Sequence, residues 1–223
     1  MTTENTVSGI LINGTAGNDS IINFGDDVTV NSGSGNDTIY SGLDDRKADR
    51  VSINAGAGNN VVSIQSGSDS VTIRTGDGNN LIGSTSPNNA VFTGAGNDSV
   101  VFYTGSDNNT VETGDGDDVI QAVGHNVTID TGAGNDSIRT FRNAHDITIK
   151  PGTGDDDITL GGPVDTDHTN VVQYADGDGN DSISTFSATD TLQITSGSIS
   201  GAALVGNNVE ISVRSEERRV GKE

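Results

Sequence analysis

The sequence predicts an all-β fold, a parallel β-roll or β-solenoid of 18–20-residue coils that ends in a small terminal β cap. Three observations lead to this prediction. A glycine-rich turn motif recurs along the chain, its copies are spaced at near-constant intervals, and alternating apolar residues flank each copy. A fixed period of this length is typical of a solenoid, in which each repeat buries its apolar face only by stacking on its neighbours.

The turn motif is clearest at residues 93–100, TGAGNDSV, which recur as TGAGNDSI at 131–138. Looser copies share a second glycine followed by Asn-Asp, Asp-Asp or Asn-Asn, and are separated by 18, 23, 20, 18, 20, 18, 20 and 25 residues. We call the last residue of each copy its closing residue. The closing residues are Asp19, Asp37, Asn60, Asn80, Asp98, Asp118, Asp136, Asp156 and Asp181.

Apolar residues keep a fixed distance from the first glycine of each copy. Six positions after it stand Ile39, Val62, Ile82, Val100, Ile120, Ile138, Ile158 and Ile183, and three before it stand Val30, Ile53, Ile73, Val91, Val111, Ile129 and Ile149. Alternation of apolar and polar residues indicates strands with one buried face, and β-branched residues favour strands over helices. Each coil is therefore expected to contain a strand, the glycine turn, a second strand and a second turn.

The chain is expected to divide into a lead-in at 1–12, the solenoid array at 13–160, and a last repeat with a β cap at 161–213. The two long intervals place their extra residues at 43–50 and 161–170, which we interpret as surface loops. Residues 214–223 contain four of the eleven Lys and Arg residues and no trace of the repeat. Their order matches a translated sequencing-adapter read, so we interpret them as a non-native tail.

Composition limits the classes of partner. The net charge of −21 disfavours nucleic acid and anionic membranes and favours bound cations. The chain has no cysteine, which excludes disulfides and thiolate metal sites. No apolar run approaches the roughly 20 residues of a membrane span, and the first ten residues do not read as a signal peptide. We therefore expect a soluble chain that is not exported by a cleaved leader.

The spacing Gly-x-Gly-Asn-Asp-x-Ile, repeated over residues 13–183, resembles the RTX (repeats-in-toxin) or hemolysin-type calcium-binding repeat family, whose nonapeptide G-G-x-G-x-D-x-U-x binds calcium in a parallel β-roll. The resemblance implies that the nine closing residues are metal ligands. It also implies roles for Gly33, Gly35, Gly94, Gly96, Gly114, Gly116, Gly132, Gly134, Gly152, Gly154, Gly177 and Gly179. Asn60 and Asn80 depart from the pattern and are expected to give weaker sites. The opposite turn lacks the motif, so one row of several calcium ions is expected.

Coordination chemistry supports the same interpretation. Glycine allows a tight turn with exposed carbonyls, and the closing Asp adds a carboxylate. Calcium takes about 6–8 oxygen ligands, more than one turn supplies, but two turns stacked about 4.8 Å apart can hold an ion between them. The alternative is a metal-free solenoid with stacked Asn and Asp side chains. A column of seven carboxylates about 5 Å apart would then repel itself.

Other signals are weaker. Asp77, Asp115 and Asp178 lie between the two glycines and either assist in binding or are solvated. His125 and His145 are expected to stack on adjacent coils, where they could share a transition metal, although exposed histidines are the simpler interpretation. Thr75, Thr93, Thr113 and Thr131 also align, which resembles in part the threonine faces of ice-binding RTX-like solenoids. Structural threonines are the default.

The expected function is that of a calcium-binding structural or interaction module that folds on calcium binding. By family analogy it would belong to a secreted or cell-surface protein, an adhesin or toxin-like polypeptide exported by type I secretion. Its partners beyond calcium would be host or cell-surface glycans or proteins, and we expect no catalytic residues. The alternatives are part of a polysaccharide lyase or epimerase, and a metal-free or ice-binding-like solenoid. Exposed Tyr, Arg and His converging on one strand face would favour the enzyme.

Overall fold

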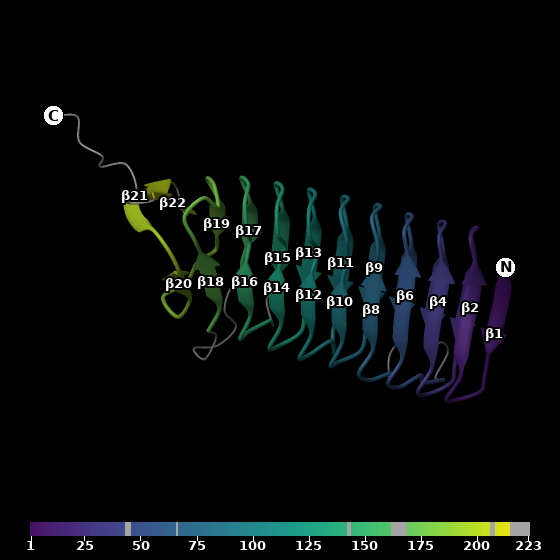
Figure 1. Cartoon of the computed structure of the whole chain (residues 1–223). Helices are drawn as coiled ribbons and strands as arrows, with labels where there is room; N and C mark the ends of the chain where they lie inside the picture. Colours follow the sequence, from purple (N-terminus) through teal and green to yellow (C-terminus); the bar gives the residue numbers. More distant parts are fainter. Residues whose placement is uncertain (43–45, 66, 142–143, 162–168, 206–207, 215–223) are drawn as a thin grey trace.

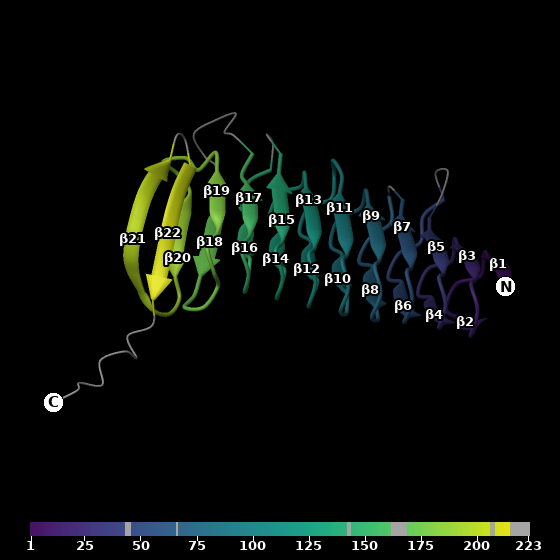
Figure 2. The same ribbon diagram turned by 90° about the horizontal axis from the view of Figure 1, so that it is seen from above.

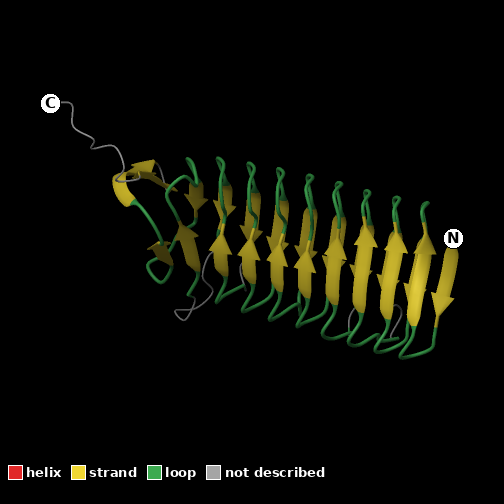
Figure 3. Cartoon of the chain, in the orientation of Figure 1, coloured by secondary structure: helices red, strands yellow, loops and turns green. Residues whose placement is uncertain are grey.

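The computed structural model describes residues 1–42, 46–65, 67–141, 144–161, 169–205 and 208–214. In these residues the chain winds into a β-solenoid of strands and turns without helices (Figures 1 and 3). Successive strands alternate between two sheets, and each strand pairs in parallel with the equivalent strand of the next coil. The predicted all-β solenoid is therefore confirmed. No helix in the described part of the chain is long or apolar enough to cross a membrane.

Twelve strands form the first sheet. In spatial order they are β1 (Thr2–Asn5), β3 (Ser20–Asn23), β5 (Thr38–Ser41), β7 (Val61–Ile64), β9 (Leu81–Ser84), β11 (Ser99–Phe102), β13 (Val119–Ala122), β15 (Ser137–Thr140), β17 (Asp157–Thr159), β19 (Ser182–Ser184), β22 (Asn208–Arg214) and β21 (Ser198–Val205). Apart from β1, β21 and β22, each of these strands follows a glycine turn.

Ten strands form the second sheet, and all of them except the last lead into the glycine turns. They are β2 (Leu11–Thr15), β4 (Thr29–Gly33), β6 (Ser52–Gly56), β8 (Thr72–Thr75), β10 (Ala90–Phe92), β12 (Thr110–Glu112), β14 (Thr128–Asp130), β16 (Thr148–Lys150), β18 (Val171–Tyr174) and β20 (Thr191–Ile194).

The core is a narrow column between the two sheets. The strand register places equivalent residues side by side, for example Val100 beside Ile120 in one sheet and Val91 beside Val111 in the other. All the apolar positions predicted from the distance to the first glycine are buried. Each coil thus adds one or two β-branched side chains per sheet, which explains how a chain with only 30% hydrophobic residues forms a core.

The C-terminal end departs from the parallel pattern. Strands β21 and β22 form an antiparallel hairpin, and β22 continues the first sheet by pairing antiparallel with β19 (Figure 2). The hairpin lies where a small cap was expected. It includes Arg214, which pairs with Ser198, so the excluded tail overlaps β22 by one residue. Residues 215–223 and the loop segments 43–45 and 162–168 lie outside the described residues.

The second turn is more regular than its sequence indicates. One residue in each copy adopts the left-handed conformation, with φ between 54° and 57° for Asn88, Asn108, Asn126 and Asp146. Asn and Asp tolerate this conformation better than other side chains that carry a Cβ. The Asn108 amide donates to Asn88 Oδ1 at 3.2 Å, and the Asn126 amide donates to Asn108 Oδ1 at 2.8 Å. Side-chain amides therefore link successive coils at this turn.

Candidate metal centre

The closing residues of the nine glycine turns lie in one buried column. Every one of them is at most 6% exposed, and each stands just before a strand of the first sheet. The backbone N–H of each of the first eight closing residues donates to Oδ1 of the closing residue in the next coil, at 2.7–3.1 Å. The structure therefore brings together all nine side chains that the sequence pattern selected.

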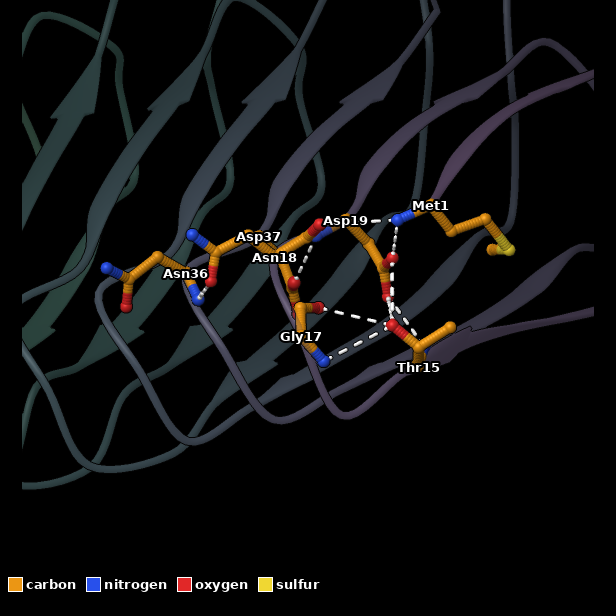
Figure 4. A network of polar contacts seen from close by, with 7 residues as sticks. All are labelled: Met1, Thr15, Gly17, Asn18, Asp19, Asn36 and Asp37. Atoms are coloured by element: carbon orange, nitrogen blue, oxygen red, sulfur yellow. Dashed lines mark hydrogen bonds and ion pairs between the residues drawn. The ribbon is translucent and has the colours of Figure 1, made fainter.

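A second ladder runs beside the first on the exposed side. The residue before each closing residue is Asn or Asp in all nine copies, from Asn18 to Asn180. Its Oδ1 accepts the backbone N–H of the equivalent residue in the next coil at 2.8–3.2 Å. Figure 4 shows both ladders at the first turns, where Asn36 donates to Asn18 and Asp19 donates to Asp37. Sequence analysis assigned no role to this residue, although its invariant Asx character was a signal.

Only one carboxylate oxygen of each closing Asp takes part in the ladder. The other, Oδ2, is buried and has no hydrogen-bond partner within the described structure. This holds for Asp37, Asp98, Asp118, Asp136, Asp156 and Asp181. A buried polar atom without a partner is costly, and a buried charge more so. Six such oxygens in one column therefore call for a positive group.

The ends of the column differ from its middle. Asp19 Oδ2 accepts the N–H of Thr15 at 2.5 Å, and its Oδ1 contacts the Met1 ammonium (Figure 4). These hydrogen bonds, first of all that of the ammonium, lower the pKa of Asp19. In the last turn the Tyr174 hydroxyl donates to the Gly179 carbonyl, and burial raises the pKa of Tyr174 to about 12.

Asn60 and Asn80 reveal which atoms surround the free Oδ2 positions. Asn60 Nδ2 lies 3.1 Å from the Gly56 carbonyl and 3.0 Å from the Gly58 carbonyl of its own turn, and 3.1 Å from Asn80 Oδ1 of the next coil. Because the coils stack in register, the free oxygen of an Asp coil occupies the corresponding place among the corresponding oxygens. Acceptors then face one another there. The Thr113 hydroxyl of the same turn also lowers the pKa of Asp118, although it donates to the Thr131 carbonyl.

Burial and mutual repulsion disfavour ionisation of the column. Burial raises the pKa of Asp118, Asp136 and Asp156 to about 6 and that of Asp181 to about 7, and neighbouring carboxylates contribute in the same direction. Burial also raises the pKa of Asp98. Ionising these groups near neutral pH therefore places negative charge where burial opposes it. A bound cation would relieve both the burial cost and the repulsion.

The glycines make the close approach of the turns possible. Gly134 has φ +140°, and a Cβ on it would lie 2.1 Å from the Gly116 carbonyl oxygen of the preceding coil. No side chain fits at that distance, so only glycine allows the two turns to stack. The predicted glycines accordingly lie beside the column, with backbone carbonyls available next to the carboxylates.

By analogy with the contacts of Asn60, we expect oxygen atoms to surround each free Oδ2. For Asp118 the positions equivalent to the contacts of Asn60 are the carbonyls of Gly114 and Gly116 and Oδ1 of Asp136. Nowhere in the described ranges do three or more His, Cys, Asp or Glu side chains gather as a metal cluster, so backbone carbonyls would supply much of the coordination. Calcium accepts such mixed and flexible oxygen sets, whereas magnesium demands near-ideal octahedral geometry. The residues therefore fit calcium.

The candidate histidines and the aspartates between the two glycines lie outside the buried column. The rings of His125 and His145 stack with centroids 3.9 Å apart, which confirms the expected stacking. A metal shared by the two rings stays a prediction. Asp77 Oδ1 accepts the N–H of Ala95, and Asp178 Oδ2 accepts that of Ala175.

The threonine column faces inward. Thr113 and Thr131 are fully buried, and their hydroxyls donate to the carbonyls of Thr131 at 3.1 Å and Pro151 at 2.6 Å. Thr93 donates to the Thr113 carbonyl in the same way. An ice-binding face built from this column is therefore wrong, and the default of structural threonines is confirmed.

A shallow hollow of about 260 Å³ lies on the first sheet. It is lined by Tyr40, Val61, Val62, Ser63, Leu81, Ile82, Gly83, Val101 and Tyr103. Tyr40 and Tyr103 line the hollow from coils three apart, and neither Arg, His nor a carboxylate is among the residues lining it. The hollow lacks the combination of groups that would favour an enzyme.

No family model matches the chain, and no curated protein matches it. Among solved structures it is similar to a hyperactive, Ca²⁺-dependent, β-helical antifreeze protein from an Antarctic bacterium, with 20% identity over 77% of this chain and 72% of that chain. The TM-score is 0.41, and a likeness at that level supports no conclusion about the ligand of this chain. Membership of the RTX family stays a prediction.

Proposed function

We propose that this chain is a calcium-binding structural module in which one row of ions joins successive coils. The observation that carries the proposal is the column of six buried Oδ2 atoms without a donor. The ligands would be the closing Asp residues together with the carbonyls of the adjacent glycines. When bound, calcium would supply the positive charge that these oxygens lack.

Calcium binding and folding would be coupled. The sites exist only when the turns are stacked, so the free energy of binding stabilises the folded chain. Without the ion, the ionised carboxylates of the column repel one another. The core contributes only one or two side chains per coil and sheet to offset this repulsion. Most of the ion-free chain is therefore expected to be expanded at neutral pH.

We further propose, from the repeat resemblance and the acidic surface, that the module belongs to a secreted or cell-surface protein of the RTX type. Its role there would be to present adhesive or toxin-like regions to glycans or proteins, and it would not itself be an enzyme. Extracellular calcium modules bind with Kd of about 10⁻⁴ to 10⁻³ M, so low intracellular calcium would keep such a chain unfolded until export.

Circular dichroism and small-angle scattering in excess calcium and in excess chelator test the proposal, with magnesium at equal concentration as the control. Calcium should give a compact β spectrum, whereas chelator and magnesium should leave most of the chain expanded. An unchanged compact β spectrum in chelator, together with no calcium bound in equilibrium dialysis, would favour the metal-free solenoid instead.

An ice-binding-like solenoid is a second candidate, because a different threonine column faces outward on the second sheet. Strand pairing aligns Thr29, Ser52, Thr72, Ala90, Thr110, Thr128 and Thr148. Threonine is also a favoured residue at exposed strand positions, so the alignment needs a direct assay. Thermal hysteresis that is abolished by Thr128→Glu but retained in Ser137→Glu, on the opposite sheet, would support ice binding. Absence of hysteresis in the wild type would exclude it.

A further inference from the structure

We infer that Asn60 and Asn80 place their own side-chain amides where cations bind in the aspartate coils, so that part of the array is stacked without calcium. The inference rests on the proposed calcium function of the other coils. It replaces the expectation that Asn60 and Asn80 act as weak calcium ligands.

The contacts of Asn60 use both ends of its amide. Its Oδ1 accepts the backbone N–H of Asp37 at 3.0 Å, as in every other step of the ladder. Its Nδ2 donates to the two carbonyls of its own turn, Gly56 and Gly58, and to Asn80 Oδ1 in the next coil. Since backbone N–H is a donor, the atom facing it must be the oxygen, and this fixes the orientation of the amide.

Asn80 repeats the arrangement one coil later. Its Oδ1 accepts the N–H of Asn60 at 3.1 Å. Its Nδ2 lies 3.2 Å from the Gly76 carbonyl, 2.8 Å from the Gly78 carbonyl and 2.9 Å from Asp98 Oδ1. The amide therefore donates to one oxygen of the carboxylate that begins the next run of Asp coils.

The aspartate coils have the equivalent carbonyls but no side-chain amide to donate to them. At Asp118 an oxygen takes the place of the amide nitrogen, and its Oδ2 has no partner. An amide NH₂ supplies two protons to this cage of oxygens, whereas a carboxylate supplies none. Each amide is also neutral, so Asn60 and Asn80 together leave the column with two fewer buried charges. Asn60 and Asn80 thus donate to the glycine carbonyls of their own turns, and a cation there would have to displace a bonded NH₂ group.

The array is consequently divided. Asp37 lies on one side of the asparagine pair, and Asp98, Asp118, Asp136, Asp156 and Asp181 lie on the other. The coils around residues 56–84 contain no buried unpartnered carboxylate oxygen among the described residues. They should therefore remain stacked when calcium is removed, and they would provide the folded segment from which ion-dependent stacking spreads.

Calcium stoichiometry tests the inference directly. Equilibrium dialysis should show two more ions bound to the N60D/N80D variant than to the wild type, because each substitution creates a new unpartnered carboxylate oxygen. N59D/N79D is the matched control, since it adds the same two charges to the neighbouring exposed residues and should add no ion. Unchanged stoichiometry in N60D/N80D, with a wild type that does bind calcium, would overturn this inference alone. A wild type that binds no calcium would overturn the proposed function and the inference with it.

Hydrogen exchange of the wild-type chain gives a second readout that does not depend on folding of the variants. In excess chelator, peptides covering residues 56–84 should exchange more slowly than peptides covering 114–140, and calcium should remove the difference. Equal exchange of the two regions in chelator would contradict an ion-independent segment.

Discussion

Asp118→Asn should stabilise the ion-free chain while removing a calcium site. The new amide would face the carbonyls of Gly114 and Gly116, as the Asn60 amide faces those of Gly56 and Gly58. A buried polar atom left without a partner costs about 1–3 kcal/mol, so the variant should gain about that much in chelator. Calcium at ten times Kd stabilises the wild-type site by about 1.4 kcal/mol, and at 100 times Kd by about 2.7 kcal/mol. The advantage of the variant should therefore shrink by these amounts as calcium rises.

Osmolyte-induced folding in chelator, followed by circular dichroism, measures the ion-free stability even if that state is mostly expanded. Asp117→Asn is the matched control, because it removes the same charge from the adjacent exposed residue and keeps the oxygen that accepts from Asn135. Asp118→Asn should fold at a lower osmolyte concentration than Asp117→Asn and should bind fewer ions. Equal midpoints, or equal calcium stoichiometry, would refute the assignment of Oδ2 as the unsatisfied atom.

Three further outcomes are expected. In the presence of calcium, Gly134→Ala should lower the stability of the folded chain by at least about 1–3 kcal/mol, because a φ of +140° and a carbonyl oxygen 2.1 Å from the new Cβ leave no room for a side chain. Gly83→Ala, whose Cβ would have its nearest contact 3.6 Å away, should be nearly neutral in thermal melts. In chelator, stability should be greatest near pH 4 and fall as the pH rises through about 6–7. The reason is that burial raises the folded-state pKa of Asp118, Asp136, Asp156 and Asp181 above the unfolded value. A scan showing greater stability at pH 7.5 than at pH 4.5 would contradict this. Thr113→Val should lose the hydroxyl bond to Thr131, worth about 1 kcal/mol, and lower the melting temperature in calcium, while Thr128→Val on the outer face should not.

The fold was predictable because it follows from the spacing of residues along the sequence. Coil spacing and β-branched columns place Ile120 beside Val100 and Ile138 without any knowledge of side-chain direction. The same alternation could have corrected the threonine column. Thr113 stands two residues after the inward-facing Val111, so strand periodicity places it inside as well.

The chemistry of the site was less predictable because it depends on side-chain orientation. Spacing alone indicated that Asn60 and Asn80 lie in the column. It did not indicate that Nδ2 donates to the glycine carbonyls while Oδ1 accepts the backbone N–H of the preceding closing residue. The exposed ladder was missed for a related reason. Its Asn and Asp residues hydrogen-bond to the next coil, and a pattern search for metal ligands passes over side chains whose role is to align backbones.

The two ladders also explain why insertions leave the column intact. The step from Asp37 to Asn60 spans 23 residues and that from Asp156 to Asp181 spans 25, yet their ladder bonds measure 3.0 and 2.9 Å, as in the 18-residue steps. The glycine turns are fixed by hydrogen bonds at the closing residue and at the residue before it, so extra length has to leave the coil elsewhere. The spacing of the carboxylates is thereby independent of repeat length. Whether a coil needs an ion then depends on one atom, the oxygen or nitrogen that its closing residue presents to the glycine carbonyls.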